Sequence, residues 1–271
     1  MTNELPLKSL LESGAHFGHQ THKWNPKMKK YVYGEKNGIY VIDLTQTIPL
    51  AKKAYEFIKK TAAEGKPVLF VGTKRQASGA IKKAAESCGA YHVTHRWLGG
   101  MLTNYKTIAL SIDKIRKVEK MKENGDFTLL TKKEQSKIEK EVLKLERNLG
   151  GIKDMRKIPG ALFIVDPSHE RIAIKEANTL GIPIVAITDT NCDPSGIEYV
   201  VPGNDDAIKS VGLFVDYFAN SVAEGNSQAV AHASKAKKND RPERDLALEK
   251  EIISKYENDV DLIVDEEEET V

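Results

Sequence analysis

Cysteine is scarce in this sequence. The 271 residues include only Cys88 and Cys192, with no Cys-x-x-Cys pair, so a disulfide framework and a zinc site built from cysteines are excluded. No apolar run approaches the roughly 20 residues that a membrane-crossing helix needs. The first residues also lack the basic-then-apolar profile of a secretory signal. We therefore expect a soluble protein of a reducing cytoplasm, without a membrane partner.

The signatures of several enzyme classes are missing as well. The sequence contains no G-x-x-x-x-G-K-[ST] phosphate loop, no G-x-G-x-x-G dinucleotide fingerprint and no H-E-x-x-H metalloprotease motif. No Ser-His-Asp or Cys-His set has local support, and the acidic neighbour of Cys192 would raise the pKa of its thiol instead of activating it. We expect a protein without catalytic activity and without a cofactor.

Charge is distributed unevenly along the chain. The formal net charge is only +2, yet residues 241–271 carry twelve acidic and four basic side chains. The positive excess elsewhere comes from two segments. Residues 20–40 hold five lysines against one glutamate, and residues 104–158 hold fifteen basic against nine acidic side chains. A basic surplus confined to two segments indicates a polyanionic partner that is bound at fixed places.

Short apolar runs alternate with amphipathic segments through most of the chain. The apolar runs predict five strands, at Ile39–Leu44, Val68–Val71, Leu162–Val165, Pro183–Ile187 and Glu198–Val201. The amphipathic segments predict helices over Ile48–Ala63, Ala77–Ser87 and His169–Leu180, with a last helix beginning near Pro202–Asp206. Gly89 and Gly181 stand where helix caps are expected. This alternation predicts an α/β fold of three layers, in which helices cover both faces of a mostly parallel sheet.

One long segment, Lys106–Arg147, interrupts the alternation because it shows only helical spacing. Two apolar rows recur along it, Ile108, Ile112, Ile115 and Val118, and then Ile138, Val142, Leu145 and Leu149. Asn124-Gly-Asp126 marks a turn, and Thr131-Lys-Lys-Glu134 has the form of a capping box. We predict an antiparallel, coiled-coil-like helical hairpin that projects as an arm. Two helices packed flat on the sheet are the alternative.

These patterns divide the chain into three parts. Residues 1–103 and 150–223 form the α/β body, and residues 104–149 form the inserted helical hairpin. Residues 224–271 change to a polar and then strongly acidic composition, so we expect a disordered tail there. We assign no chemistry to this tail.

An open parallel sheet binds ligands beyond the carboxyl ends of its strands. Gly72-Thr-Lys-Arg75 follows a predicted strand and opens a helix, so Lys74 and Arg75 are candidate anion ligands. This context leaves an α/β enzyme that binds nucleotide or metal at the strand ends as the alternative function.

Histidines and aspartates raise the question of a metal. His16, His19 and His22 are spaced three apart and would approach Asp189 and Asp193 if the amino terminus folds over the strand ends. Imidazoles and carboxylates suit a divalent cation. A hydrogen-bonded structural role for the histidines is the other interpretation.

The clearest local pattern lies between His22 and Tyr31, where lysines are interleaved with aromatic residues. Its candidate RNA contacts are Lys23, Trp24, Asn25, Lys27, Lys29 and Lys30. Lysines neutralise phosphates, and aromatic faces accept splayed bases. The sequence leaves open whether Trp24 stacks on RNA or packs in the protein core.

A second candidate segment, His95–Lys106, leads into the predicted hairpin. Arg96, Asn104 and Lys106 are its candidate RNA contacts, because Arg96 can pair bidentately with phosphate. Trp97, Leu98 and Met101 are expected to lie in the core beneath the root of the hairpin.

Seven stretches of the sequence carry a wider resemblance. They are His16-Phe-Gly-His-Gln20, Lys23-Trp-Asn-Pro-Lys-Met28, Phe70-Val-Gly-Thr-Lys74, Arg96-Trp-Leu-Gly-Gly-Met-Leu-Thr-Asn104, Asn148-Leu-Gly-Gly-Ile-Lys-Asp-Met155, Asp189-Thr-Asn-Cys-Asp-Pro194 and Pro202-Gly-Asn-Asp-Asp-Ala207. In this order, from about Leu7 to Val222, the chain resembles the bacterial family of small-subunit ribosomal protein S2. The tail lies outside the resemblance.

The resemblance implies a flavodoxin-like body with an inserted helical hairpin. It also implies a cytoplasmic, ribosome-bound adaptor that binds ribosomal RNA at the head–body junction and has no cofactor. Its expected partners are ribosomal RNA and neighbouring small-subunit proteins, including protein S1, which captures messenger RNA. We expect no homo-oligomer. A scaffold that binds only other proteins is a third class, and it would bind independently of nuclease and salt.

Overall fold

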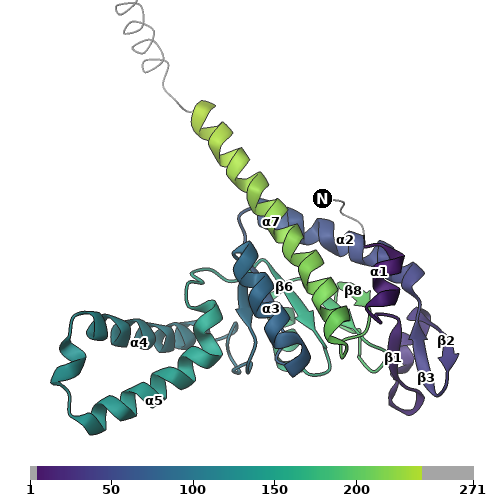
Figure 1. The fold of residues 1–271 in the computed structure, drawn as a ribbon. Helices are drawn as coiled ribbons and strands as arrows, with labels where there is room; N and C mark the ends of the chain where they lie inside the picture. The colour runs from purple at the N-terminus through teal and green to yellow at the C-terminus, as the bar shows by residue number, and fades with distance from the viewer. Residues whose placement is uncertain (1–4, 240–271) are drawn as a thin grey trace, which may run out of the picture. The chain divides into compact units, whose positions relative to one another are not determined.

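The computed structural model describes residues 5–239, and its main sheet has five strands in the order β5-β4-β6-β7-β8 (Figure 1). The strands are β4 Val68–Val71, β5 Tyr91–Val93, β6 Ala161–Val165, β7 Ile184–Thr188 and β8 Tyr199–Pro202. All four neighbouring pairs are parallel. Within this sheet the chain first forms β4, then adds β5 on one side and β6, β7 and β8 on the other, which is the flavodoxin-like order. The predicted three-layer α/β fold is confirmed.

Helices cover both faces of this sheet. On one face α2 (Leu44–Ala63), α3 (Arg75–Cys88) and the first turns of α7 (Ile208–Asn239) share a buried cluster with the strands. On the other face α6 (Arg171–Leu180) and the root of the helical hairpin form a second cluster. Every residue of β4, β6 and β7 is buried, as expected for strands covered on both sides.

A second, smaller sheet corrects one prediction. β1 (Phe17–Gln20), β2 (Val32–Lys36) and β3 (Ile39–Ile42) pair antiparallel in the order β1-β3-β2. The predicted strand Ile39–Leu44 therefore belongs to this sheet and not to the parallel one. Asn37 and Gly38 join β2 to β3 with positive φ angles of 54° and 76°, the backbone that a two-residue hairpin turn requires.

The inserted segment contains two paired helices, α4 (Tyr105–Glu123) and α5 (Lys132–Leu149). The four apolar residues predicted on α4 are all buried, and Phe127 and Val142 close the same cluster. The predicted capping box of Thr131 and Glu134 is present at the start of α5. Ile108 and Leu149 are buried together with residues of the main sheet. The base of the hairpin is therefore continuous with the body core.

The last helix, α7, continues to Asn239, so the predicted start of the tail at residue 224 falls inside a helix. Alanines and lysines in residues 224–239 favour helix, although their polar composition had suggested disorder. The rest of the predicted tail, residues 240–271, lies outside the described residues. Among the helices that the structure describes, none has the length and hydropathy that a bilayer crossing requires.

The loop before α4 is held by one buried carboxylate, that of Glu176 on α6. Its Oε1 accepts hydrogen bonds from Trp97 Nε1 at 3.1 Å and from the Gly100 N–H at 2.7 Å. Its Oε2 accepts from the N–H groups of Leu102 at 2.9 Å and Thr103 at 3.1 Å. Burial alone would raise the pKa of Glu176, but these donors lower it below its ordinary value. Trp97 and Met101 are buried, as predicted, whereas Leu98 is only partly buried.

Replacing Glu176 by Gln should lower the free energy of unfolding at neutral pH by about 2–3 kcal/mol. The N–H groups of the loop need an acceptor, and the amide of Gln places an NH₂ donor where a carboxylate oxygen accepts them. The carboxylate has a lowered pKa in the folded state, so its stabilisation is complete above the unfolded pKa of 4.5 and is lost as the pH falls through the lower folded value. Urea denaturation of both proteins should therefore show a difference that shrinks below about pH 4.5. Glu86→Gln, at an exposed position of α3, is the control. A difference independent of pH would contradict this role.

Candidate nucleic-acid interface

A cluster of charged side chains around Lys74 lies at the carboxyl ends of the parallel strands. Lys74 Nζ lies 3.0 Å from Asp166 Oδ2, 2.7 Å from Asp205 Oδ1 and 2.6 Å from Asp206 Oδ1. Asp166 follows β6, and Asp205 and Asp206 follow β8. Burial alone would lower the pKa of Lys74, but the carboxylates of Asp205 and Asp206 raise it above its ordinary value. One ammonium group therefore links the ends of three strands.

His19 extends this cluster to the small sheet. Its Nδ1 lies 3.0 Å from Asp189 Oδ2, and its Nε2 lies 3.3 Å from Asp206 Oδ2. The hydrogen bond to Asp189 is the main reason that the pKa of His19 is raised. The amino-terminal strand β1 is thus tied to the ends of β7 and β8.

Of the five metal-ligand candidates in the sequence, the structure brings together only His19 and Asp189. The candidates that do not join them are His16, His22 and Asp193. Two other carboxylates, those of Asp205 and Asp206, lie near His19. One imidazole nitrogen of His19 and one carboxylate oxygen from each aspartate all lie within 4.8 Å of one another. Lys74 already supplies a positive charge at this place.

The Lys74 cluster also bears on the predicted anion site at Lys74 and Arg75. The point between β4 and β6, where the chain connections leave in opposite directions, is where this type of sheet usually binds a ligand. Here Lys74 is only 18% exposed and is surrounded by three carboxylates, which would repel a phosphate. The ammonium of Lys74 is therefore used in ion pairs within the α/β body, whereas the side chain of Arg75 is exposed at the start of α3.

The first candidate RNA segment is a loop with a rigid backbone. Asn25 Oδ1 accepts a hydrogen bond from the Lys27 N–H at 3.0 Å, which caps a short 3-10 helix over Pro26–Tyr31. The Asn25 N–H donates to the Thr190 carbonyl at 2.8 Å, and Met28 is fully buried. Asn25 therefore has a structural role in this loop.

The lysines of this segment differ in their surroundings. Lys23, Lys29 and Lys30 are exposed, and Lys30 Nζ lies 4.7 Å from the centre of the Tyr31 ring. Lys27 Nζ is instead 2.8 Å from Asp193 Oδ2 and donates to Ser195 Oγ at 2.8 Å. The hydrogen bond from Lys27 holds the pKa of Asp193 at about 2. The charge of Lys27 is thus largely compensated within the chain, which weakens the case for Lys27 as an RNA contact.

Trp24 is half-buried and packs against Tyr40. The two ring centres lie 5.1 Å apart, with their planes tilted by 46°. This contact fixes the indole on the small sheet and leaves part of it exposed.

The second candidate segment surrounds the root of the hairpin. Arg96, Asn104 and Lys106 are all exposed. Asn104 Oδ1 accepts from Thr107 Oγ1 at 3.0 Å, and the Glu176 carboxylate fixes the loop between Arg96 and Asn104. The small sheet and the hairpin lie at opposite ends of the α/β body (Figure 1). The structure therefore places the two candidate segments far apart.

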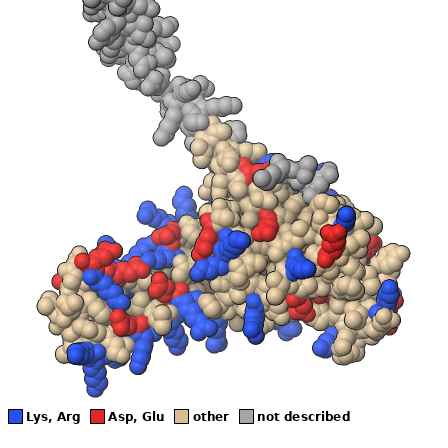
Figure 2. Space-filling model, in the orientation of Figure 1, with Lys and Arg blue, Asp and Glu red and all other residues tan. Residues whose placement is uncertain are grey.

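A row of lysines on α5 was not singled out from the sequence. Lys133, Lys137, Lys140 and Lys144 are exposed at spacings of four, three and four residues, which places them along one side of the helix. Within residues 5–239 no carboxylate lies within 4.0 Å of these ammonium groups, whereas Lys122 pairs with Glu139 at 3.2 Å and Lys114 pairs with Glu141. Figure 2 shows Lys and Arg side chains gathered over the hairpin, with acidic side chains among them. The charge excess of residues 104–158 was the sequence signal for this row.

Replacing Lys74 by Met should lower the free energy of unfolding by about 3–5 kcal/mol, because it leaves carboxylates unpaired in a buried site. Arg75→Met, at the neighbouring exposed position, should change it by less than about 0.5 kcal/mol. Adding Asp205→Asn to Lys74→Met should restore part of the loss, since it removes a buried carboxyl group that has lost its ammonium partner. Urea denaturation measures all three. A Lys74→Met protein as stable as the parent would contradict the role of the cluster.

Comparison with known proteins agrees with this architecture. The model of the ribosomal protein S2 family matches residues 10–225. Two similar relatives, each named small ribosomal subunit protein uS2, come from two strains of Treponema pallidum, one of them the Nichols strain. Each is 53% identical over 222 residues, which cover 82% of this chain and 76% of the relative.

These matches extend over the parallel sheet, the hairpin and the strand-end cluster. The family consists of structural, non-enzymatic proteins of the ribosome, which is cytoplasmic. The alternative of a nucleotide- or metal-dependent enzyme is therefore set aside. The chain belongs to the ribosomal protein S2 family and is a structural constituent of the small ribosomal subunit.

Proposed function

We propose that the chain binds small-subunit ribosomal RNA through two separated surfaces. The loop surface consists of Lys23, Trp24, Lys29 and Lys30. The hairpin surface consists of Arg96, Asn104, Lys106 and the lysine row of α5. The observation that carries this proposal is that these lysines are exposed and, among residues 5–239, have no carboxylate within 4.0 Å of their ammonium groups. Buried anchors such as Met28 hold the backbone that presents them.

Rigid, separated contacts suit an RNA partner. Exposed lysines neutralise phosphates and release counterions, and the exposed part of Trp24 offers a face to a base or ribose. Because the surfaces lie at opposite ends of the body, each raises the effective concentration of RNA at the other. The same separation lets the protein orient two RNA elements relative to each other. The resemblance supports the head–body junction as the place of binding.

The hairpin acts in this proposal as an arm, residues 104–149, that carries one RNA surface away from the α/β body. Support comes from the pairing of α4 with α5 and from the continuity of their base with the body core, which fixes the direction of the arm. Deleting the whole segment would remove Ile108 and Leu149 from that core. Substitution of exposed lysines is therefore the cleaner test of the arm.

Protein partners follow from the same resemblance. We propose that the chain contacts neighbouring small-subunit proteins and supports the recruitment of protein S1. It enters the particle as a single copy and not as a homo-oligomer. Small subunits that lack this chain should then retain less S1 through sedimentation, and adding the purified chain back should restore it.

Replacing Lys23, Lys29 and Lys30 together by Ala should weaken binding to small subunits that lack this chain and should reduce the slope of log affinity against log salt by about two to three. Each lysine lost removes about one phosphate contact. Replacing the same three residues by Arg keeps the charge and should preserve the slope. An unchanged slope in the Ala variant would remove the loop surface from the interface, and binding that resists both nuclease and salt would favour a scaffold of proteins alone.

Replacing Lys133, Lys137, Lys140 and Lys144 by Ala should leave the melting temperature of the free protein nearly unchanged, because these side chains are exposed and lack ion-pair partners among the described residues. Incorporation into small subunits should fall, as measured by competition with the parent protein during reconstitution. The four Lys→Arg substitutions are the matched control. Equal incorporation of the Ala variant would show that the arm makes no phosphate contact through α5.

A further inference from the structure

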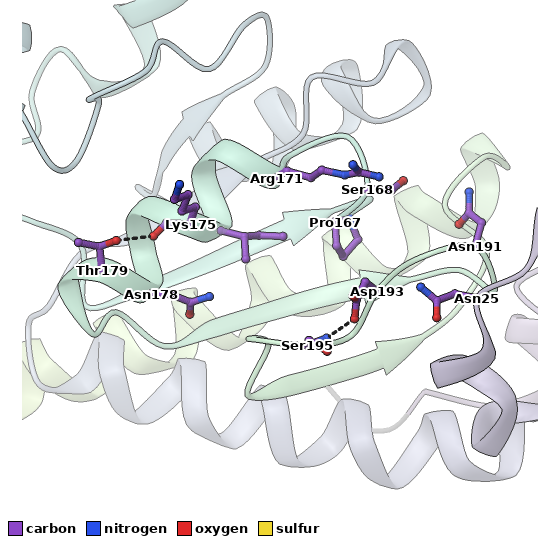
Figure 3. A pocket seen from close by; sticks show the side chains of 11 residues that line it. Asn25, Pro167, Ser168, Arg171, Lys175, Asn178, Thr179, Asn191, Asp193 and Ser195 are labelled. Atoms are coloured by element: carbon purple, nitrogen blue, oxygen red, sulfur yellow. Dashed lines mark hydrogen bonds between the residues drawn. The ribbon is translucent and has the colours of Figure 1, made fainter.

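A polar groove of about 750 Å³ runs beside α6, next to the loop that carries the loop surface (Figure 3). Arg171, Lys175 and Asn178 on α6 line one side of it. Asn191 and Ser195, in the connection after β7, line the other. Apart from Pro167 and Ile174, the lining side chains are polar or charged. Most of the lining side chains can therefore form hydrogen bonds with a ligand.

The charge of this groove is positive. Arg171 and Lys175 are exposed, stand four residues apart on one side of α6 and, within the part of the chain that the structure describes, have no carboxylate within 4.0 Å. The one acidic lining residue, Asp193, is neutralised by Lys27 at 2.8 Å. Two uncompensated cations at this spacing favour an anion, and the guanidinium can grip a phosphate with two parallel hydrogen bonds.

Three asparagines complete the lining. The side chain of Asn178 lies against Gly196, which has a φ of 78° and where an added Cβ would come within 2.5 Å of Asn178 Nδ2. Asn191 Oδ1 accepts a weak hydrogen bond from Cys192 Sγ at 3.3 Å, and Asn25 caps the neighbouring 3-10 helix. These contacts hold the amides in place. Amides present a donor beside an acceptor, which matches the edges of nucleobases.

We propose that this groove, the α6 groove, binds a nucleotide of a single-stranded ribosomal RNA segment, with phosphate at Arg171 and Lys175 and a base among the asparagine amides. The proposal rests on the proposed RNA-binding function. The groove is continuous with the loop surface, because Asn25 lines the groove and belongs to the same loop as Lys23 and Lys29. That continuity, together with three amides and few apolar side chains, favours RNA over an acidic peptide.

Ultraviolet cross-linking of intact small subunits, followed by mass spectrometry of the peptides, tests the groove directly. Peptides containing residues 171–179 or 191–195 should carry a ribonucleotide. Cross-links from these peptides to another protein, or no ribonucleotide on them while the peptide of residues 23–30 carries one, would overturn the groove and leave the proposed function standing. No ribonucleotide on any peptide of this chain, in subunits where other proteins are cross-linked, would overturn both.

Variants give an independent measurement. Arg171→Ala with Lys175→Ala should lower affinity for small subunits lacking this chain about ten-fold or more and reduce the salt slope by about one to two. Lys52→Ala with Lys60→Ala removes the same charge from exposed positions of α2 and should have a smaller effect. Asn178→Asp with Asn191→Asp should weaken binding while leaving the melting temperature of the free protein close to that of the parent. If the α2 pair and the α6 pair weakened binding equally, the effect would come from the net positive charge of the protein and not from the groove. That result would overturn the proposal.

Discussion

The largely buried ammonium of Lys74 makes the contacts on which much of this architecture depends. Three carboxylates, Asp166, Asp205 and Asp206, converge on it from the ends of β6 and β8, and they would repel one another without it. His19 joins the same network through Asp206 and Asp189, so the small antiparallel sheet is fixed to the parallel one. Buried charges of this kind are tolerated only when they are paired with good geometry.

This arrangement explains how a fold that often binds nucleotides supports a structural role. The position that would receive a phosphate, between β4 and β6, is filled by a lysine and its three acidic partners. The loop surface, the hairpin surface and α6 carry exposed cations on the outside of the described residues. In the proposed function, RNA binding therefore uses the outer surfaces of the protein and not the strand ends.

Both proposed RNA surfaces depend on buried anchors. Met28 and the Asn25 cap hold the loop with Lys23, Lys29 and Lys30. On the opposite side, the Glu176 carboxylate binds the backbone between Trp97 and Thr103 and so fixes the root of the hairpin. Side chains presented on rigid backbone lose less entropy on binding than those on mobile loops, which favours affinity and a defined orientation.

Much of this protein was determined by local sequence patterns. The apolar runs placed β4, β6, β7 and β8, the Thr131 capping box placed the start of α5, and Gly89 and Gly181 adopt the left-handed caps expected of them. The short strands β1, β2 and β5 were missed, although Asn37-Gly38 is a hairpin signal.

Only the tertiary structure decided which lysines are paired with carboxylates and which are not. Asp205 lies 131 residues from Lys74 along the chain, and Asp193 lies 166 residues from Lys27. Such pairings depend on where the fold brings strand ends together. Periodicity reports which face of an element is buried, whereas the compensation of a charge depends on neighbours that only the folded chain supplies.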